Sequence, residues 1–268
     1  MDPLDPLRLR RMLPARLRAG RRIEVLARVD STNDALRRRL AEGRAGDGEV
    51  LAAEVQVGGR GRRARDWWSG PPGANLAVSV LLQPPPRPPE AVGVAAAVAA
   101  ARALQPWTGE PLALRWPNDL LLGGRKLGGF LAEMPAAGSG PAAILGFGLN
   151  VHAAPPDEGL RTPAIGLDEA AGPGAPPRDR TRILALWLLG LDRELLRLER
   201  SGPASLEERF LAGLRRWAPR GVRPRDGGGP AGPLVEFSVS RGLTWGPEGA
   251  RVTRPPGLVP PLEPLPPA

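Results

Sequence analysis

The chain has no cysteine and no tyrosine, and histidine and lysine are almost absent. The absence of cysteine excludes disulfide bonds, thiolate metal ligands and cysteine nucleophiles. His152 is the single histidine, so we expect neither a Ser/His/Asp triad nor metal-binding residues in the chain itself. No apolar run approaches the roughly 20 residues of a membrane span. The N-terminal residues also lack the apolar core of a signal peptide. We therefore expect a cytoplasmic protein with no membrane partner.

Lysine and asparagine are so scarce that the few present mark candidate functional positions. Lys126 is the single lysine among the 37 basic residues, and the asparagines are Asn33, Asn75, Asn118 and Asn150. The net charge of +9 alone would suggest a nucleic-acid partner. Because acidic residues are interleaved among the arginines, we interpret the arginine content as a compositional bias. A nucleic-acid-binding module stays as an alternative, and it predicts salt-sensitive binding without ATP turnover.

The 268 residues suffice for one large domain and a small one. Apolar runs predict strands at 23–29, 50–57, 75–82, 112–116, 120–122, 126–134 and 142–151, and helices at 33–42, 90–104, 181–199 and 204–217. Residues 153–178 are expected to be irregular. Short segments at 222–225, 234–240 and 250–253 predict a small β module, and residues 255–268 are expected to fray. We divide the chain into domains at 1–217 and 218–268.

A loop rich in glycine and arginine, Glu54 to Ser69, lies between two predicted strands. Glycine allows the backbone to approach a ligand closely, and arginine supplies planar, permanently charged donors. The glycines are at positions 58, 59 and 61, and the arginines at 60, 62, 63 and 65. Because strands hold both ends, the loop is an anion-binding candidate and not a disordered tail.

The remaining candidate groups are neutral hydrogen-bonding side chains and cations, without a cluster of carboxylates. Such a set suits phosphate chemistry, in which cations stabilise spreading negative charge and positioning replaces covalent catalysis. No Gly-x-x-x-x-Gly-Lys-Ser/Thr loop is present, so a P-loop nucleotidase is not predicted.

Six segments, in this order, resemble the motifs of biotin protein ligases. They are Asp30-Ser31-Thr32-Asn33, Gly59-Arg60-Gly61-Arg62-Arg63 with Trp67, Gly73-Ala74-Asn75-Leu76, Trp116-Pro117-Asn118-Asp119-Leu120, Arg125-Lys126-Leu127-Gly128-Gly129 and Gly146-Phe147-Gly148-Leu149-Asn150. The resemblance covers residues 23–151 strongly and the C-terminal part weakly. All four asparagines and the single lysine fall within these segments.

The resemblance implies an α+β fold, with a mixed β-sheet and flanking helices of the class II synthetase-like biotin/lipoate ligase type, followed by a small SH3-like β-barrel. It also implies a carbon–nitrogen ligase reaction in two steps. ATP and Mg²⁺ would convert biotin to biotinyl-5′-AMP, and the biotin would then pass to a lysine in the biotin carboxyl carrier domain of acetyl-CoA carboxylase or a related carboxylase.

The resemblance also assigns residues to each substrate. Biotin would contact Ser31, Thr32, Asn33, Gln56, Arg60, Gly61, Arg62 and Lys126. The nucleotide would contact Arg62, Arg63, Asn118, Lys126 and Asn150. Arg62, Lys126 and Asp119 would be catalytic, with Asp119 orienting or deprotonating the acceptor lysine, unless it only holds its turn or a magnesium-bound water.

An alternative within the same fold is a lipoate ligase or a lipoyl or octanoyl transferase. The Arg-Gly-Arg-Arg and Trp-Pro-Asn-Asp segments favour the biotin type. Too few residues precede the first predicted strand for a winged helix-turn-helix, so we expect a ligase that does not bind DNA. We expect a monomer or a homodimer. Gly58 and Val57 depart from the family pattern and make the loop more flexible and less polar.

Overall fold

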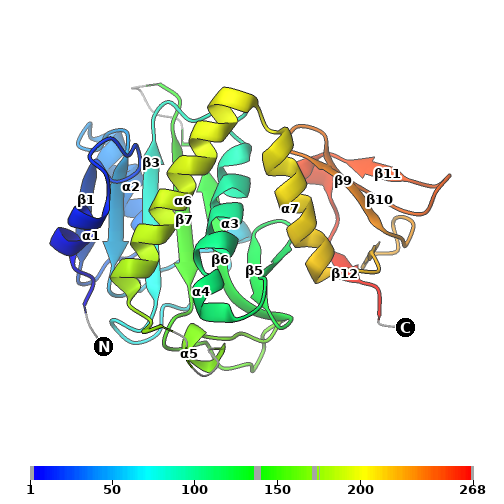
Figure 1. Cartoon of the computed structure of the whole chain (residues 1–268), viewed down its shortest axis with the longest axis horizontal. Helices are drawn as coiled ribbons and strands as arrows, with labels where there is room; N and C mark the ends of the chain where they lie inside the picture. Colours follow the sequence, from blue (N-terminus) through cyan, green and yellow to red (C-terminus); the bar gives the residue numbers. More distant parts are fainter. Residues whose placement is uncertain (1–2, 136–139, 171–173, 175, 267–268) are drawn as a thin grey trace.

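The computed structural model describes residues 3–135, 140–170, 174 and 176–266, and its centre is one seven-stranded mixed sheet (Figure 1). The strand order is β1-β2-β3-β7-β6-β5-β4. The bounds are β1 Arg22–Leu26, β2 Glu49–Ala53, β3 Leu76–Leu82, β4 Ala113–Arg115, β5 Asp119–Leu122, β6 Arg125–Glu133 and β7 Ala143–Leu149. Strands β1 and β2 are parallel, and the other neighbours are antiparallel. The expected mixed sheet is confirmed.

Helices cover both faces of this sheet. Their bounds are α1 Pro6–Met12, α2 Thr32–Ala41, α3 Ala91–Ala103, α4 Gln105–Thr108, α5 Leu167–Ala170, α6 Arg180–Ser201 and α7 Ala204–Trp217. The long α6 lies beside the alanine-rich α3 over one face (Figure 1). At their contact, a Cβ atom added to Gly190 would lie 3.3 Å from that of Ala99, so small residues allow the close approach. Helix α2 packs on the opposite face, against β3 and β7.

Strand register separates the side chains that face the core from those that face α2. Val78, Phe147 and Phe130 are aligned across β3, β7 and β6. Phe147 stacks on Phe130 and also packs against Trp187 of α6, with ring centroids 4.8 Å apart in both pairs. Because strand side chains alternate between faces, the neighbouring positions, including Gly148, face the other side. That face, where α2 does not cover it, carries the candidate site.

A small β region follows α7 (Figure 1). It has a three-stranded antiparallel sheet and a two-stranded one, formed by β8 Val222–Pro224, β9 Leu234–Ser238, β10 Gly242–Trp245, β11 Val252–Arg254 and β12 Leu262–Pro264. These small antiparallel sheets agree with the expected barrel-like module. The division into domains at residues 1–217 and 218–268 stays a prediction.

Several local expectations were wrong. The segment 255–268 was expected to fray, but β12 pairs with β8 and buries Leu262, a contact that local composition does not reveal. Strand β10 and helix α1 were not predicted, and α5 lies within the segment expected to be irregular. Among the described residues, no helix is both long enough and apolar enough to span a membrane.

Candidate active site

A cavity of about 520 Å³ lies on the α2 face of the sheet. Its walls come from the start of α2, the Gly/Arg loop, the ends of β5, β6 and β7, the segment 159–162 and the C-terminal module. The predicted residues that line it are Ser31, Thr32, Asn33, Gln56, Arg60, Gly61, Arg62, Arg63, Asn118, Asp119 and Lys126. Residues from four separate stretches of sequence therefore meet in one place.

Neutral groups that bond to one another form one wall. The Oε1 atom of Gln56 accepts hydrogen bonds from the backbone N of Thr32 at 2.8 Å and from its Oγ1 at 3.0 Å. Ser79 of β3 donates to Asn33 Oδ1 at 2.6 Å, and its Oγ lies 2.7 Å from Thr32 Oγ1. Ser79, Thr32 and Asn33 are all buried. This network fixes the wall before any ligand enters, and we call it the neutral wall.

Glycine makes room for the neutral wall. Gly146 of β7 lies under Asn33, where an added Cβ would come within 2.6 Å of Asn33 Oδ1. The amide nitrogen of Asn33 donates to Glu133 Oε2 at 2.7 Å. Glu133 also pairs with Arg37 at 2.7 Å. Asn33 is therefore held from both ends of its amide.

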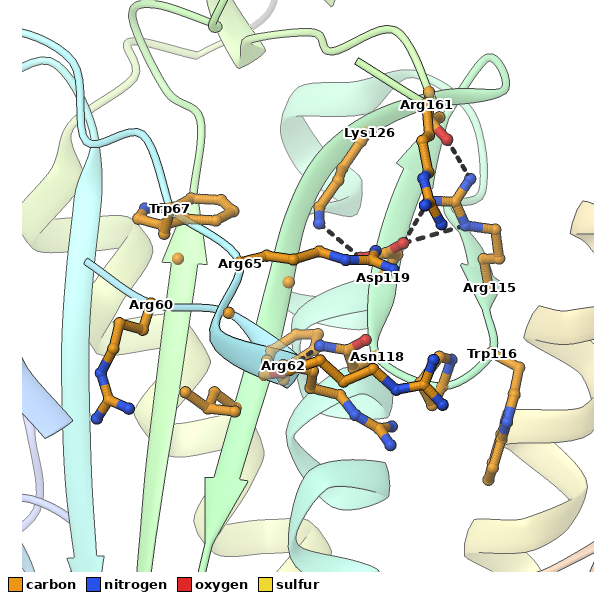
Figure 2. Close-up of a pocket in the computed structure, with 18 of the residues that line it drawn as sticks. Arg60, Arg62, Arg65, Trp67, Arg115, Trp116, Asn118, Asp119, Lys126 and Arg161 are labelled. Carbon is orange, nitrogen blue, oxygen red and sulfur yellow. Dashed lines mark hydrogen bonds and ion pairs between the residues drawn. The ribbon is translucent and has the colours of Figure 1, made fainter. Parts of the chain in front are cut away.

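Arg60 is directed away from the centre of the cavity (Figure 2). Its guanidinium binds the carboxylate of Asp34 through two hydrogen bonds, one of them 3.0 Å long. Asp34 lies in the first turn of α2 and also pairs with Arg37. With its charge engaged here, Arg60 can offer a ligand mainly its backbone.

Lys126 and Asp119 form the ion pair at the other side of the cavity (Figure 2). Lys126 Nζ lies 2.7 Å from Asp119 Oδ1, and Arg115 Nε donates to Asp119 Oδ2 at 3.0 Å. Thr162, from the segment 159–162, accepts a hydrogen bond from Arg115. Burial tends to raise the pKa of Asp119, but the charges of Lys126 and Arg115 outweigh it and hold this pKa below its ordinary value of 3.8. Asp119 is therefore a carboxylate at neutral pH.

A β-bulge turns Lys126 into the cavity. Leu120 pairs with Gly128, but the next residue, Leu121, pairs with Lys126, so Leu127 is the extra residue in β6. Simple alternation from Gly129 would send Leu127 into the cavity and Lys126 into the core. The bulge reverses this order, since Leu127 is fully buried in the core and Lys126 lines the cavity.

Trp67 lies flat on β7 beside Lys126. A Cβ atom added to Gly148 would come within 2.5 Å of the Trp67 indole, so this position requires glycine. Lys126 Nζ lies 5.7 Å from the centroid of the ring, within the range of a cation–π contact. The buried Nε1 of Trp67 has no hydrogen-bond partner among the described residues.

The Gly/Arg loop folds back on itself. Gly61 N donates to Arg65 O at 2.7 Å, and Trp67 N to Gly59 O at 2.8 Å. Arg63 has a left-handed φ of 55° at the tip. Arg62 is exposed, yet partial desolvation and the neighbouring Arg63 lower its pKa, while Asp119 acts in the opposite direction. The guanidinium groups of Arg62, Arg63 and Arg65 form no hydrogen bond or ion pair with another described residue.

A hydrogen bond closes the base, or neck, of the Gly/Arg loop. Gly73 N donates to Glu54 O at 3.1 Å, which joins the start of the loop to the segment that follows its end. Beneath this bond, the fully buried Arg180 pairs with the Glu54 carboxylate at 2.7 Å and donates to Asn75 O at 3.1 Å. One arginine of α6 therefore fastens the start of the loop and the segment that follows its end to the body of the protein.

Asn118 and Asn150 have supporting contacts. The Asn118 side chain donates to the carbonyl of Phe130, which fastens its turn to β6. The structure does not place Asn150 on the cavity lining. Asn150 is buried, and its amide nitrogen lies 3.4 Å from Lys126 O. Its buried Oδ1 has no hydrogen-bond partner among the described residues.

The similarity of the chain to known proteins identifies its family. The profile of the Biotin/lipoate A/B protein ligase family matches residues 25–150. A biotin–[acetyl-CoA-carboxylase] ligase of Mycobacterium tuberculosis is 37% identical over 207 residues, which span 75% of this chain and 74% of that protein. The chain belongs to the biotin/lipoate A/B protein ligase family.

Two further similar proteins differ in the share of their length that the chain matches. The bifunctional ligase/repressor BirA of Escherichia coli is 37% identical over 135 residues, 49% of this chain but only 41% of that protein. A biotin protein ligase of Aquifex aeolicus in complex with biotin and ATP superimposes with a TM-score of 0.70 at 26% identity, over 87% of this chain and 94% of that one. The present protein and the Aquifex aeolicus protein therefore share their fold over nearly their whole length.

Several residues that support the candidate site of the present protein were not predicted from its sequence. Ser79 and Glu133 hold the neutral wall, and Thr162 accepts a hydrogen bond from Arg115, which holds Asp119. Ser79 had a signal, because it is a polar residue in an otherwise apolar strand. The cavity wall built by residues 256–264 had no signal, because only tertiary contacts bring it there.

Proposed function

We propose that the protein is a biotin protein ligase, which activates biotin with ATP and transfers it to a lysine of the biotin carboxyl carrier domain of acetyl-CoA carboxylase or a related carboxylase. The observation that carries this proposal is that the neutral wall and the cations Lys126 and Arg62 face one cavity. Biotin has the same two parts, a neutral ureido ring and a carboxylate.

The neutral wall suits the ureido end of biotin. Gln56 Oε1 already accepts two hydrogen bonds from Thr32, which leaves Gln56 Nε2 to donate to the ureido carbonyl. Ser31 also lines the cavity, at the start of α2. Since these groups are already held in place, binding would cost little side-chain ordering.

The cations suit the reaction step. The carboxylate oxygen of biotin attacks the α-phosphorus of ATP, the bond to the β-phosphate oxygen breaks, and pyrophosphate leaves. Two anions must meet, so positive charge has to offset their repulsion. Lys126 would hold the carboxylate and the developing acyl phosphate, and Arg62 the phosphate. In the second step the acceptor amine attacks the acyl carbon, the carbon–oxygen bond to AMP breaks, and the amine loses a proton.

Asp119 suits the role of an orienting group better than that of a base. Its pKa is lowered by Lys126 and Arg115, so it would be a weak acceptor for the proton of an ammonium group, whose ordinary pKa is about 10.4. As a carboxylate it can align Lys126 and attract the incoming lysine.

Magnesium would enter with ATP. No group of three or more acidic or histidine side chains suited to a metal gathers within the described residues. Phosphate oxygens would then supply most of the ligands, as is usual for magnesium nucleotides, and Asp119 is positioned nearby. The ion would neutralise phosphate charge.

On the nucleotide side, the Trp67 ring lines the cavity and offers a flat surface for adenine. Asn150 would act through its contact with the Lys126 carbonyl. Arg63 would assist with the phosphates, and Asn118 would hold the turn that carries Asp119.

The test is to incubate the protein with magnesium, ATP and radiolabelled biotin or lipoate, and then with an apo carrier domain. We expect the acyl-adenylate and the labelled carrier domain to form from biotin and not from lipoate. An acyl-adenylate from lipoate and not from biotin would overturn the proposal in favour of a lipoate ligase.

A further inference from the structure

Exposed apolar side chains gather on the segments that line the cavity. Among the described residues, seven large hydrophobic side chains are exposed, and four belong to these segments. Val57 and Trp68 lie in the Gly/Arg loop, Leu160 in the segment 159–162, and Leu258 between the cavity-lining residues Gly257 and Val259. Scattered single residues need no explanation, but here three separate segments that line one cavity each carry exposed apolar side chains, which is typical of an interaction surface.

Leu258 is 70% exposed although its segment is firmly held. It ends the short helical turn Pro256–Leu258, and its N–H donates to Pro255 O at 2.9 Å. The following strand β12 pairs with β8. Prolines around it further restrict the backbone. The structure therefore presents this leucine to solvent at a fixed position beside the cavity.

The same segments carry positive charge that is not neutralised. Arg63, Arg65 and Arg161 line the cavity, and their guanidinium groups form no hydrogen bond or ion pair with another described residue. The cavity mouth thus combines apolar points with available arginines. A complementary surface would carry apolar and acidic side chains. The phosphates of a nucleic acid could satisfy the arginines, but the phosphate backbone offers no apolar partner for the aliphatic side chains.

We propose that Val57, Trp68, Leu160 and Leu258 form a docking rim for a folded acceptor domain that presents its lysine beside apolar and acidic residues. The inference rests on the proposed function and deepens it. The apolar points lie on three separate segments, which suits a folded surface better than a single extended peptide. The lysine side chain enters the cavity toward Asp119, while the rest of the domain stays outside on the rim.

The test separates docking from chemistry with a matched pair of leucines. Leu258→Asp changes the rim, and Leu7→Asp changes an equally exposed leucine on α1, 71% exposed and outside the cavity lining. Each protein is assayed for biotinyl-AMP formation without acceptor, and for transfer to a recombinant apo biotin carboxyl carrier domain. Thermal unfolding checks that both variants are folded.

We expect Leu258→Asp to raise the KM for the carrier domain about tenfold, since a charge in a desolvated contact is costly, with adenylate formation within about twofold of wild type. Leu7→Asp should match wild type in both assays. For the wild type, added salt should raise the carrier KM and leave biotin binding nearly unchanged.

A wild-type carrier KM for Leu258→Asp would overturn the docking rim. Equal losses in adenylate formation and transfer would also overturn it, because the leucine would then act within the site. An oligonucleotide could instead inhibit transfer equally in the wild type and in Leu258→Asp. If it does so, and the variant keeps the wild-type KM for the carrier domain, the arginines would be assigned to nucleic-acid binding. Absence of biotinyl-AMP from the wild type would refute the proposed function itself, which is a separate result.

Discussion

The two sides of the cavity hold their polar groups in opposite ways. On the neutral wall, Thr32, Asn33, Gln56 and Ser79 are buried or half-buried and hydrogen-bonded to one another. On the loop side, Arg62, Arg63 and Arg65 extend without ion pairs to other described residues. The difference follows from solvation. Buried neutral groups need partners within the protein, whereas exposed guanidinium groups stay hydrated until an anion arrives.

The comparison indicates that the two sides of the site have different roles in ligand binding. A pre-bonded wall recognises a neutral shape with little ordering, and unpaired cations keep their charge available for phosphate. Lys126 lies between these cases, because Asp119 holds it at 2.7 Å while it still lines the cavity. The following experiments test this difference between the two sides of the cavity.

The largest effect is expected from the cations. Lys126→Ala and Arg62→Ala should each reduce biotinyl-AMP formation by about 10²–10³-fold, because each removes charge stabilisation at the transferring phosphate. Both variants should keep a folded circular-dichroism spectrum. Lys126→Arg is the control that keeps the charge and changes its shape. Pyrophosphate release at the wild-type rate in both alanine variants would refute the assignment.

A smaller effect is expected from the neutral wall. Ser79→Ala leaves Asn33 Oδ1 without its donor, and loss of such a bond costs about 1–3 kcal/mol. Biotin affinity measured by calorimetry should fall about tenfold, with little change in the maximal rate of adenylate formation. Ser238→Ala, which changes a buried serine of the C-terminal module, is the matched control. A large loss of maximal rate with unchanged affinity would contradict this difference between the two sides.

Ligand protection of the loop should be several-fold. Trypsin should cut between Arg60 and Arg65 readily without ligand and slowly with biotin and ATP, because a loop that closes over an adenylate loses the open forms that protease needs. Since Arg180 fastens the neck at Glu54 and Asn75, the ligand-sensitive cuts should be confined to the loop. Mass spectrometry of the fragments gives the measurement. Equal cleavage in both states would leave the loop as a phosphate binder without a closing role.

The smallest effect concerns pH and Asp119. Its pKa is lower in the folded protein than its ordinary value of 3.8, so its pairs contribute stability above that pH and lose it as pH falls through the folded pKa. Asp119→Asn should therefore lower the melting temperature at pH 7, and this deficit should shrink in more acidic buffer. A deficit that is constant from pH 7 to acid would show that the charge does not stabilise the fold.

Much of the central domain was predictable because its signals are local. Strands β3 and β7 are apolar runs between turn residues, and α6 shows an apolar stripe at helical spacing. Scarcity identified Lys126 and the asparagines as candidates. Less local features were not predicted: residues 255–268 were expected to fray, but β12 pairs with β8. Asn150 is absent from the cavity lining, and its expected contact with the nucleotide stays a prediction.

By itself, the sequence determined which chemical groups the protein has: one lysine, a Gly/Arg loop, and neutral residues at the start of a helix, in the order of a known family. Tertiary structure alone decided where they point. The bulge at Leu127 sends Lys126 into the cavity, Ser79 fixes the neutral wall from another strand, and Gly257 and Val259 line the cavity from the far end of the chain. Composition and spacing report local preference, whereas register and long-range packing depend on partners that are distant in sequence.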